Sequence, residues 1–410
     1  MKTTIPAILL LAQGTVGHVI QRHYRQSDSA CQATGKAVYL LTNDANNAVV
    51  ALPISEDGTL AVGTVTPSSG KGSNSVDGAT MKPAQPDALV SQSALTIAGN
   101  HIFAVNAGSN SLSMLSISKN DPTKLALVGE PAAVPAEFPN TVAASAKNKL
   151  ACVGASGAVA GISCTSFSKK GLGAMDTLRS IDLGQSTPPV GPTNTVSHAF
   201  FSDDESTLFT MVKGDPAVNK TGFMSMLAVE QSVGCRGAVK IAAAPMDSRT
   251  SPAGTAVLFG SQVIPGTSTV FATDASFGAV VISVNTLTGQ AAVVGKQSID
   301  GQKATCWAAF APATKSVFVT DVATPRIIEM SASNASIIST VDLSANGDPG
   351  FIDLKAAGAF LYALSPGNGT TDAAITVMDI SGGQGTAKAI QRFSLKGMTG
   401  ANAQGIAILE

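Results

Sequence analysis

The chain has few charged and aromatic residues and little of the chemistry that marks a metal site. Of its 410 residues, 13% are charged and 5% are aromatic, with four histidines and one tryptophan. The formal net charge is −1 and like charges form no run, which argues against a basic surface for nucleic acid. The five cysteines and the histidines lack the close spacing of a zinc site, so we expect no metal.

Long hydrophobic runs are also missing from the sequence. No stretch reaches the eighteen or so apolar residues that a membrane-spanning helix requires. Residues 5–12 (IPAILLLA) follow Lys2 and precede small residues, which is the order of a secretory signal peptide cleaved after Gly17. We therefore expect a signal peptide over residues 1–17, an N-terminal segment over residues 18–35 and a secreted or cell-wall protein; a buried N-terminal strand is the alternative. Glycosylation sequons agree with export and lie at Asn219, Asn334 and Asn368.

Two of the cysteines predict a disulfide. Cys152 and Cys164 flank a turn rich in Gly, Ala and Ser between two strand-like segments. A hairpin would bring them close enough to bridge in an oxidising compartment. The other three, Cys31, Cys235 and Cys306, cannot all pair with one another, so at least one is free or intermolecular.

Short apolar segments and turns make up most of the chain. It contains 40 glycines and 44% hydrophobic residues, and Gly, Asn, Asp and Ser interrupt the apolar segments, which favours many brief strands. A unit of three or four such strands recurs about every fifty residues. The units begin near Ala37, Ala88, Pro139, Asn194, Ala253, Lys303 and Gly350.

The two ends of this repeat complement each other. The first unit lacks the leading strand that each later unit has, and residues 404–409 (QGIAIL) form a leading strand with nothing after it. We therefore predict an all-β fold, a seven-bladed β-propeller over residues 36–410, closed by the C-terminal strand in the first blade. Two β-sandwiches, which the length alone would allow, do not account for the period.

The segments AVYLLTNDANNAVVALPISEDGTL, SALTIAGNHIFAVNAGSNSLSMLSIS and NTVSHAFFSDDESTLFTMVKGD resemble the fungal 3-carboxymuconate cyclase-like proteins, a lactonase-type propeller family. The resemblance covers residues 36–410. It implies a propeller without metal or other cofactor, whose small-molecule substrate binds at the end of the central channel. Lactone-forming relatives use His, Arg and carboxylate groups there, but the second and third units begin with QPD (85–87) and FPN (138–140), where relatives often carry a basic pattern.

Three functions are compatible with this resemblance. The first is a secreted, cofactor-independent cyclase for an unsaturated oxygenated molecule, such as the hetero-Diels–Alderases of tropolone–sesquiterpenoid biosynthesis that secreted relatives resemble. The second is a 3-carboxymuconate cyclase or lactonase, and the third is a non-catalytic secreted glycoprotein or adhesin. We favour the first, because a neutral ring of hydrogen-bonding groups can orient an oxygenated substrate. The sequence leaves the oligomeric state open.

In a propeller, the ends of the second strands and the starts of the leading strands gather at one mouth of the channel. As catalytic groups there we predict His198 for proton transfer, and Lys213 and Arg326 for binding an oxygen. As substrate-binding groups we predict Asn43, Asn106, Asn140, Asn194, Asp274, Trp307, Asp321 and Gln404. The same ring includes Asp87, Gly154, Asp348 and Ser365. The alternative is that the Asn and Asp side chains bond turn amides and that His198 is a core residue.

Overall fold

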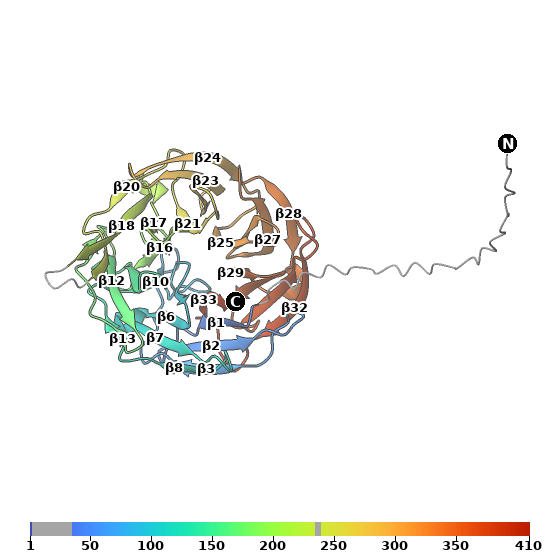
Figure 1. Ribbon diagram of the computed structural model, residues 1–410, viewed down its shortest axis with the longest axis horizontal. Coiled ribbons are helices and arrows are strands. Elements are labelled where there is room, and N and C mark those ends of the chain that lie inside the picture. The colour runs from blue at the N-terminus through green and yellow to red at the C-terminus, as the bar shows by residue number, and fades with distance from the viewer. Residues whose placement is uncertain (2–34, 234–238) are drawn as a thin grey trace. The chain divides into compact units, whose positions relative to one another are not determined.

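Short strands joined by turns make up nearly all of the structure. The computed structural model describes residue 1, residues 35–233 and residues 239–410. Outside them lie almost all of the predicted signal peptide (1–17), the segment over residues 18–34, Cys31 and Cys235. The unit Ala33–Glu410 contains a ring of seven antiparallel sheets, so the predicted seven-bladed propeller is confirmed (Figure 1).

The first four blades each consist of four or five strands; the first four follow one another from the channel outward, and a fifth, where present, pairs with the third strand. Blade 1 contains β33 (Gln404–Leu409), β1 (Ala37–Leu41), β2 (Ala48–Pro53) and β3 (Thr64–Pro67). Blade 2 contains β5 (Leu95–Ala98), β6 (His101–Asn106), β7 (Ser111–Ile117), β8 (Leu125–Leu127) and β9 (Ala132–Ala133). Blade 3 contains β10 (Pro139–Ser145), β11 (Leu150–Ala155), β12 (Gly161–Ser168), β13 (Gly171–Leu172) and β14 (Arg179–Ser180). Blade 4 contains β16 (Val196–Phe201), β17 (Thr207–Val212), β18 (Phe223–Val233), β19 (Val239–Ala243) and β20 (Ser248–Thr250).

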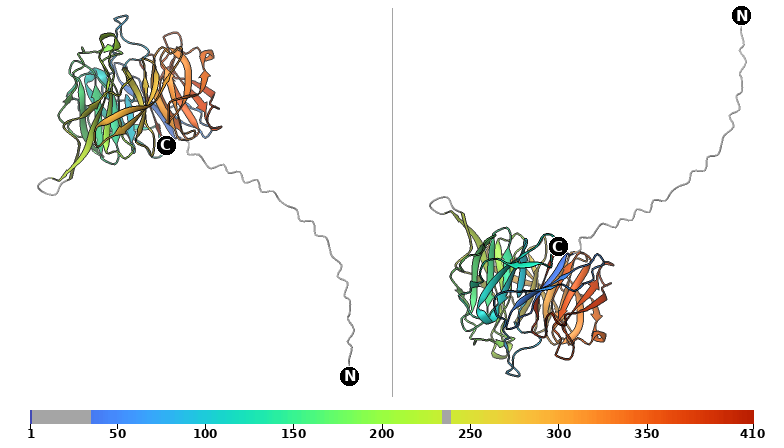
Figure 2. Two further views of the ribbon diagram at one scale, coloured as in Figure 1. Left: turned by 90° about the horizontal axis from the view of Figure 1, so that it is seen from above. Right: turned by 90° about the horizontal axis from the view of Figure 1, so that it is seen from below.

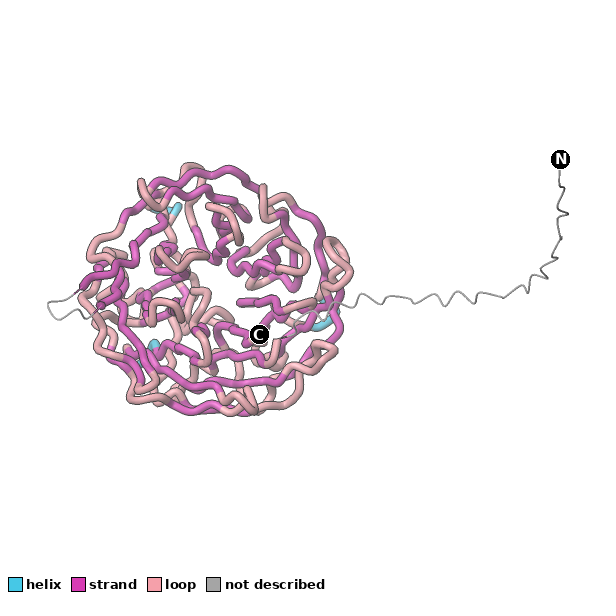
Figure 3. Tube along the Cα trace, viewed as in Figure 1, coloured by secondary structure: helices cyan, strands magenta, loops and turns pink. Residues whose placement is uncertain are grey.

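The last three blades have four strands each. Blade 5 contains β21 (Leu258–Val263), β22 (Thr269–Asp274), β23 (Gly278–Asn285) and β24 (Gln290–Ser298). Blade 6 contains β25 (Thr305–Ala311), β26 (Ser316–Asp321), β27 (Thr324–Ser331) and β28 (Ile337–Asp342). Blade 7 contains β29 (Ile352–Ala357), β30 (Phe360–Ser365), β31 (Ala374–Asp379) and β32 (Lys388–Ser394). In the described part of the chain, three short 3-10 helices interrupt the loops at Ala107–Ser109, Pro216–Val218 and Ser344–Asn346 (Figure 3). No helix among the described residues is long and apolar enough to cross a membrane.

Burial explains why the strands are so apolar. Every residue of β1, β11 and β26 is buried, because the neighbouring blades cover both faces of the inner strands. In contrast, β24 at the rim alternates exposed and half-buried residues, since one of its faces meets solvent. The core is therefore the set of interfaces between consecutive blades.

The ring closes as the repeat predicts. β33 pairs antiparallel with β1, with Val38 opposite Ile408 and Tyr39 opposite Ala407, and so supplies the innermost strand of blade 1. The Lys36 amide also donates to the Leu409 carbonyl at 2.6 Å. Closure of this kind leaves neither end of the ring with an unpaired inner edge.

Blade 2 departs from the prediction at its inner edge. The predicted leading strand starting at Ala88 is wrong, because β5 begins only at Leu95. Residues 86–94, which we call the central segment, leave the sheet, and Val90 and Ser93 adopt positive φ angles of 50° and 63°. Between two apolar blades, the polar side chains of this segment would be buried without hydrogen-bond partners. In the channel they find such partners.

Two connections between blades meet over one end of the channel. β4 (Val76–Asp77) belongs to the connection between blades 1 and 2, and β15 (Val190–Gly191) belongs to the connection between blades 3 and 4. They form a short parallel pair, with Val76 opposite Val190. This pair and the central segment that follows β4 enclose the site described below.

The predicted disulfide is present between the two middle strands of blade 3. Cys152 on β11 faces Cys164 on β12, and the two form a disulfide with Cα atoms 4.0 Å apart. The views of Figure 2 show the ring from its edge, with the β18–β19 hairpin projecting from its side. The three sequon asparagines, Asn219, Asn334 and Asn368, are exposed.

Candidate functional site

A small cavity of about 190 Å³ lies at the end of the channel covered by β4 and β15. It opens where β17, β22 and β26 end, which is the mouth at which the sequence places its ring of polar residues. Most of its wall is apolar and includes Val90, Val257, Phe259, Ala275, Ala304 and Val322. The polar groups in that wall are few, and Lys213, Asp87 and Cys306 are among them.

Lys213 follows β17 and points into the protein. It is only 1% exposed, and its Nζ donates to the Val90 carbonyl at 2.6 Å. The same nitrogen lies 4.4 Å from the centroid of the Phe259 ring. Among the described residues, no carboxylate comes within ion-pair distance of it. Burial lowers the pKa of Lys213, while the nearby charge of Asp87 opposes that shift.

Asp87 approaches the cavity from the central segment. Its Oδ1 accepts from the Val90 amide at 2.9 Å, so Val90 is bonded to Asp87 through its amide and to Lys213 through its carbonyl. Although the residue is only half-buried, protein surrounds its carboxyl group, and this burial raises the pKa of Asp87 against the opposing charge of Lys213. The site thus pairs an amine that can lose a proton with an acid that can keep one.

Cys306 on β25 completes the polar part of the wall. Its thiol is buried, and burial raises its pKa well above the usual range, so it stays protonated. The ring of Phe259, on β21, packs edge-on against the indole of Trp307 with centroids 5.0 Å apart. These contacts give the cavity a flat apolar side opposite its few hydrogen-bonding groups.

Five of the predicted site residues hold the central segment in place. Gln404 donates to the Pro86 carbonyl, Asn140 to Leu89, Lys213 to Val90 and Trp307 to Ser91, while His198 bonds the Ser93 hydroxyl. These residues come from blades 1, 3, 4 and 6. The structure brings these five residues together around the central segment, but most of their polar groups bond the backbone of residues 86–93 rather than line the cavity.

Gln92 lies at the centre of this arrangement. Its side chain is fully buried; its Nε2 donates to the Ala308 carbonyl at 2.8 Å and to Asp353 Oδ1 at 3.3 Å, and its Oε1 accepts from the Ala308 amide. A Cβ on Gly260 would collide with this amide, which explains a glycine within β21. Gln92 thus links blades 2, 6 and 7 across the channel and separates the two ends of the channel from each other.

His198 lies on the other side of Gln92. Its Nδ1 accepts from the Ser261 amide at 3.2 Å, which requires that Nε2 carries the proton and donates to Ser93 Oγ at 2.9 Å. In this tautomer His198 cannot accept a proton from Ser93. Burial lowers the pKa of His198 well below its usual range, so the ring stays neutral. Together with Lys355 it borders a separate cleft of about 360 Å³ at the opposite end of the channel.

The other predicted residues lie in turns or at the rim. Asp274 accepts from the amides of Ala256 and Val257, and Asp321 accepts from those of Lys303 and Ala304. The remaining side chains bond nearby groups: Asn43 to Ser73, Asn106 to Ser111 and Ser113, Asn194 to Asp215, and Arg326 to the Asp300 carbonyl. None of them lines the Lys213 cavity.

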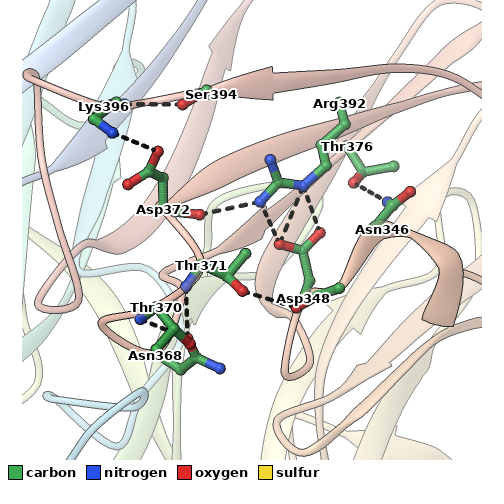
Figure 4. A network of polar contacts seen from close by, with 11 residues as sticks. Asn346, Asp348, Asn368, Thr370, Thr371, Asp372, Thr376, Arg392, Ser394 and Lys396 are labelled. Carbon is green, nitrogen blue, oxygen red and sulfur yellow. Dashed lines mark hydrogen bonds and ion pairs between the residues drawn. The ribbon is translucent and has the colours of Figure 1, made fainter.

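Asp348 of the same ring forms an ion pair. Its fully buried carboxylate accepts from the Arg392 guanidinium through both of its oxygens, with a shortest distance of 2.7 Å (Figure 4). Arg392 also donates to the Asp372 carbonyl at 3.1 Å. The pair fixes the loop before β29 to the outer strand β32.

Sequence reasoning missed Phe259, Gln92 and Asp353. Phe259 lies in an ordinary strand pattern and carries no signal of its own. Gln92 does carry one, since the run VSQS (90–93) places polar residues where a buried leading strand should be apolar. Asp353 has a positive φ of 54°, and burial raises its pKa to about 6. No group of three or more His, Cys, Asp or Glu side chains in the described parts of the chain could hold a metal.

Comparison with known proteins gives a fold and no close relative. No family model matches the chain, and no curated protein matches it. Among solved structures, the periplasmic gluconolactonase of Pseudomonas aeruginosa has a TM-score of 0.58 at 12% identity, covering 91% of this chain and 99% of that one. A proposed 6-phosphogluconolactonase from Bacteroides uniformis has a TM-score of 0.53 at 13% identity, over 70% and 80%. A hypothetical selenium-binding protein from Sulfolobus tokodaii has a TM-score of 0.56 at 10% identity, over 92% and 94%. These likenesses establish the propeller fold.

Proposed function

We propose that this protein is an enzyme that closes or opens a lactone ring in a small, unsaturated, oxygenated molecule bound in the Lys213 cavity. One observation carries the proposal, namely the buried Lys213 and the protein-enclosed carboxyl group of Asp87 facing one apolar cavity at the channel mouth. Perturbed acids and bases gather at catalytic sites more often than elsewhere. The likeness to lactonase propellers supports the same class of substrate.

The groups present suit the chemistry of ring closure. A carboxylate oxygen of the substrate attacks a carbon–carbon double bond conjugated to a carbonyl, a C–O bond forms, and the π electrons move onto the carbonyl oxygen. Lys213 donates a hydrogen bond to that developing enolate. The protonated carboxyl of Asp87 then delivers its proton to the carbon next to the carbonyl. Ring opening runs through the same steps in reverse.

The size of the cavity favours a reaction within one molecule. Its volume of about 190 Å³ is below the roughly 300–1,000 Å³ of pockets that enclose drug-sized ligands. A hetero-Diels–Alder reaction between a tropolone species and a terpene alkene must hold two such molecules together. We therefore favour the lactone chemistry over the intermolecular cycloaddition. We further propose that the protein acts outside the cell, which the Cys152–Cys164 disulfide supports.

Turnover assays with two site variants test the proposal. Purified protein is offered 3-carboxymuconate and other conjugated dienoic acids for closure, and γ- and δ-lactones for opening. Lys213→Met and Asp87→Asn should each lower kcat/KM by about 100-fold or more. Lys220→Met is the matched control, because Lys220 is exposed on the loop that follows Lys213. Folded Lys213→Met and Asp87→Asn proteins with parental turnover would refute the assignment.

A further inference from the structure

The amine of Lys213 has the surroundings of a nucleophile rather than of an ion-pair partner. Its one hydrogen-bond acceptor is the Val90 carbonyl, so the rest of the amino group faces Phe259 and the cavity. A buried lysine is normally paired with a carboxylate, and among the described residues none lies within 4.0 Å of this one. Buried lysines in apolar pockets are the ones that attack carbonyl carbons.

We propose that Lys213 forms an imine with small aldehydes and ketones that enter the cavity, so that α,β-unsaturated carbonyl compounds are among its substrates or inhibitors. The location rests on the proposed function, but the covalent step does not require ring closure. Burial, which favours the uncharged amine, supports the same assignment.

The step balances with the groups at hand. The Nζ lone pair of the uncharged amine attacks the carbonyl carbon, a C–N bond forms, and a proton passes from that nitrogen to the carbonyl oxygen to give a carbinolamine. Protonated Asp87 then gives a proton to that hydroxyl, which leaves as water while the C=N bond forms. The nitrogen releases its remaining proton back to the Asp87 carboxylate, so the acid is regenerated. Asp87 Oδ2 is available for this role, since Oδ1 alone bonds the Val90 amide.

The carbonyl compound must also fit the apolar wall. The Phe259 ring, 4.4 Å from Nζ, offers a flat surface to a conjugated double bond attached to the carbonyl. Before the nitrogen gives its proton back to Asp87, the adduct is an iminium, which draws electrons from that double bond and prepares it for addition of an internal oxygen. Substrates with an enone or enal group therefore suit the site better than saturated sugar lactones.

Reductive trapping tests the imine. The full chain is incubated with crotonaldehyde and sodium cyanoborohydride at neutral pH, digested, and analysed by mass spectrometry for the peptide that contains Lys213. We expect Lys213 to be labelled at least tenfold faster than the exposed Lys220, and Asp87→Asn to slow this labelling without affecting Lys220. Labelling of Lys213 no faster than that of Lys220 would overturn the proposal.

A second variant separates the imine from the proposed function. Lys213→Arg keeps a positive charge and hydrogen-bond donors but cannot form an imine, and it should show no adduct at this position. Lys355→Met, at the opposite cleft, should leave the Lys213 adduct unchanged. The trapping experiment detects the adduct directly, so an adduct without lactone turnover would leave the imine standing and refute only the ring-closing function. Lactone turnover without an adduct at Lys213 would refute the imine and leave the ring-closing function standing.

Discussion

Replacing Gln92 by leucine tests whether the central segment is held from inside the channel. Leucine fills a similar volume but removes the amide that bonds Ala308 and Asp353. The Gln92 amide bonds three groups, and two of them keep another partner in the variant. The Ala308 carbonyl still accepts from Gln262, and Asp353 Oδ1 still accepts from the Leu354 amide. The Ala308 amide, on the channel edge of β25, loses the partner that Gln92 provides.

The structure gives the size of the effect. A buried N–H without a partner costs about 1–3 kcal/mol, and a hydrogen bond to a charged group contributes about 1.5 kcal/mol or more. Gln92→Leu should therefore lower the free energy of unfolding by about 3 kcal/mol. Gln391 is the matched control, since it makes the same two bonds to the backbone of Leu60, at 2.7 and 2.9 Å, but is only half-buried. Water can replace those bonds, so Gln391→Leu should cost about 1 kcal/mol or less.

Equilibrium denaturation followed by tryptophan fluorescence measures both variants. Trp307 is the only tryptophan, and its indole donates to the Ser91 carbonyl at 3.0 Å, next to Gln92. The emission therefore reports directly on the central segment. A loss of stability for Gln92→Leu that is no greater than the loss for Gln391→Leu would refute the idea that Gln92 anchors the segment.

Four further results are expected. Ring-closing activity should fall as pH rises through the raised pKa of Asp87, because only the protonated carboxyl delivers a proton, and Asp87→Asn should lack this limb of the pH–rate profile. The free energy of unfolding should fall as pH drops below about 6.5, by up to about 1.4 kcal/mol per pH unit. The reason is that His198 binds a proton in the unfolded chain but stays neutral in the folded protein, so His198→Gln should flatten this slope in urea titrations. Arg392→Met should cost about 3 kcal/mol in the same assay, because it leaves the buried Asp348 carboxylate unpaired. Cys164→Ser should lower stability by about 3 kcal/mol, since it opens a covalent loop of 12 residues.

Each of these has a control within the chain. Asp77→Asn, which also borders the cavity but whose carboxylate accepts from the Ala79 and Thr80 amides, should leave the fall in activity at high pH in place. His101→Gln should change the acid slope less than His198→Gln, because His101 is half-exposed. Lys388→Met removes an exposed partner of Asp379 and should cost well under the Arg392 value. For the disulfide, reduction of the parent protein should reproduce the Cys164→Ser loss, and an unchanged unfolding midpoint after reduction would contradict it.

The repeat made the fold predictable, because each blade uses the same strand and turn pattern and because the ends of the chain complement each other. The Cys152–Cys164 pair followed from a local hairpin. The site was harder to predict, since its groups come from blades 2, 4, 5 and 6 and meet only after the ring has formed. Lys213 could be named from its place at a strand end, whereas Phe259 has no local signal.

The ring of Asn and Asp residues illustrates why position alone was not enough. Asp274 and Asp321 end their strands where the prediction places them, but their carboxylates bond amides of the preceding loop. Asn140 and Trp307 point inward and meet the central segment. That segment leaves the blade 2 sheet at the polar run VSQS (90–93), a signal that the strand pattern contains but that the prediction of a leading strand from Ala88 overlooked.

The way β33 completes blade 1 has a consequence for how the protein is made. The ribosome synthesises β1, β2 and β3 first and β33 after every other described strand, so blade 1 lacks its inner strand until the other six blades have been made. Asp353 Oδ2 accepts from the Ile406 amide, and its Oδ1 accepts from Gln92, so the arrival of β33 also completes the bonding of the central segment. The Lys213 cavity is therefore expected to form late, and a nascent chain that has all seven blades but not β33 should be inactive and prone to join the exposed edge of β1 with another chain.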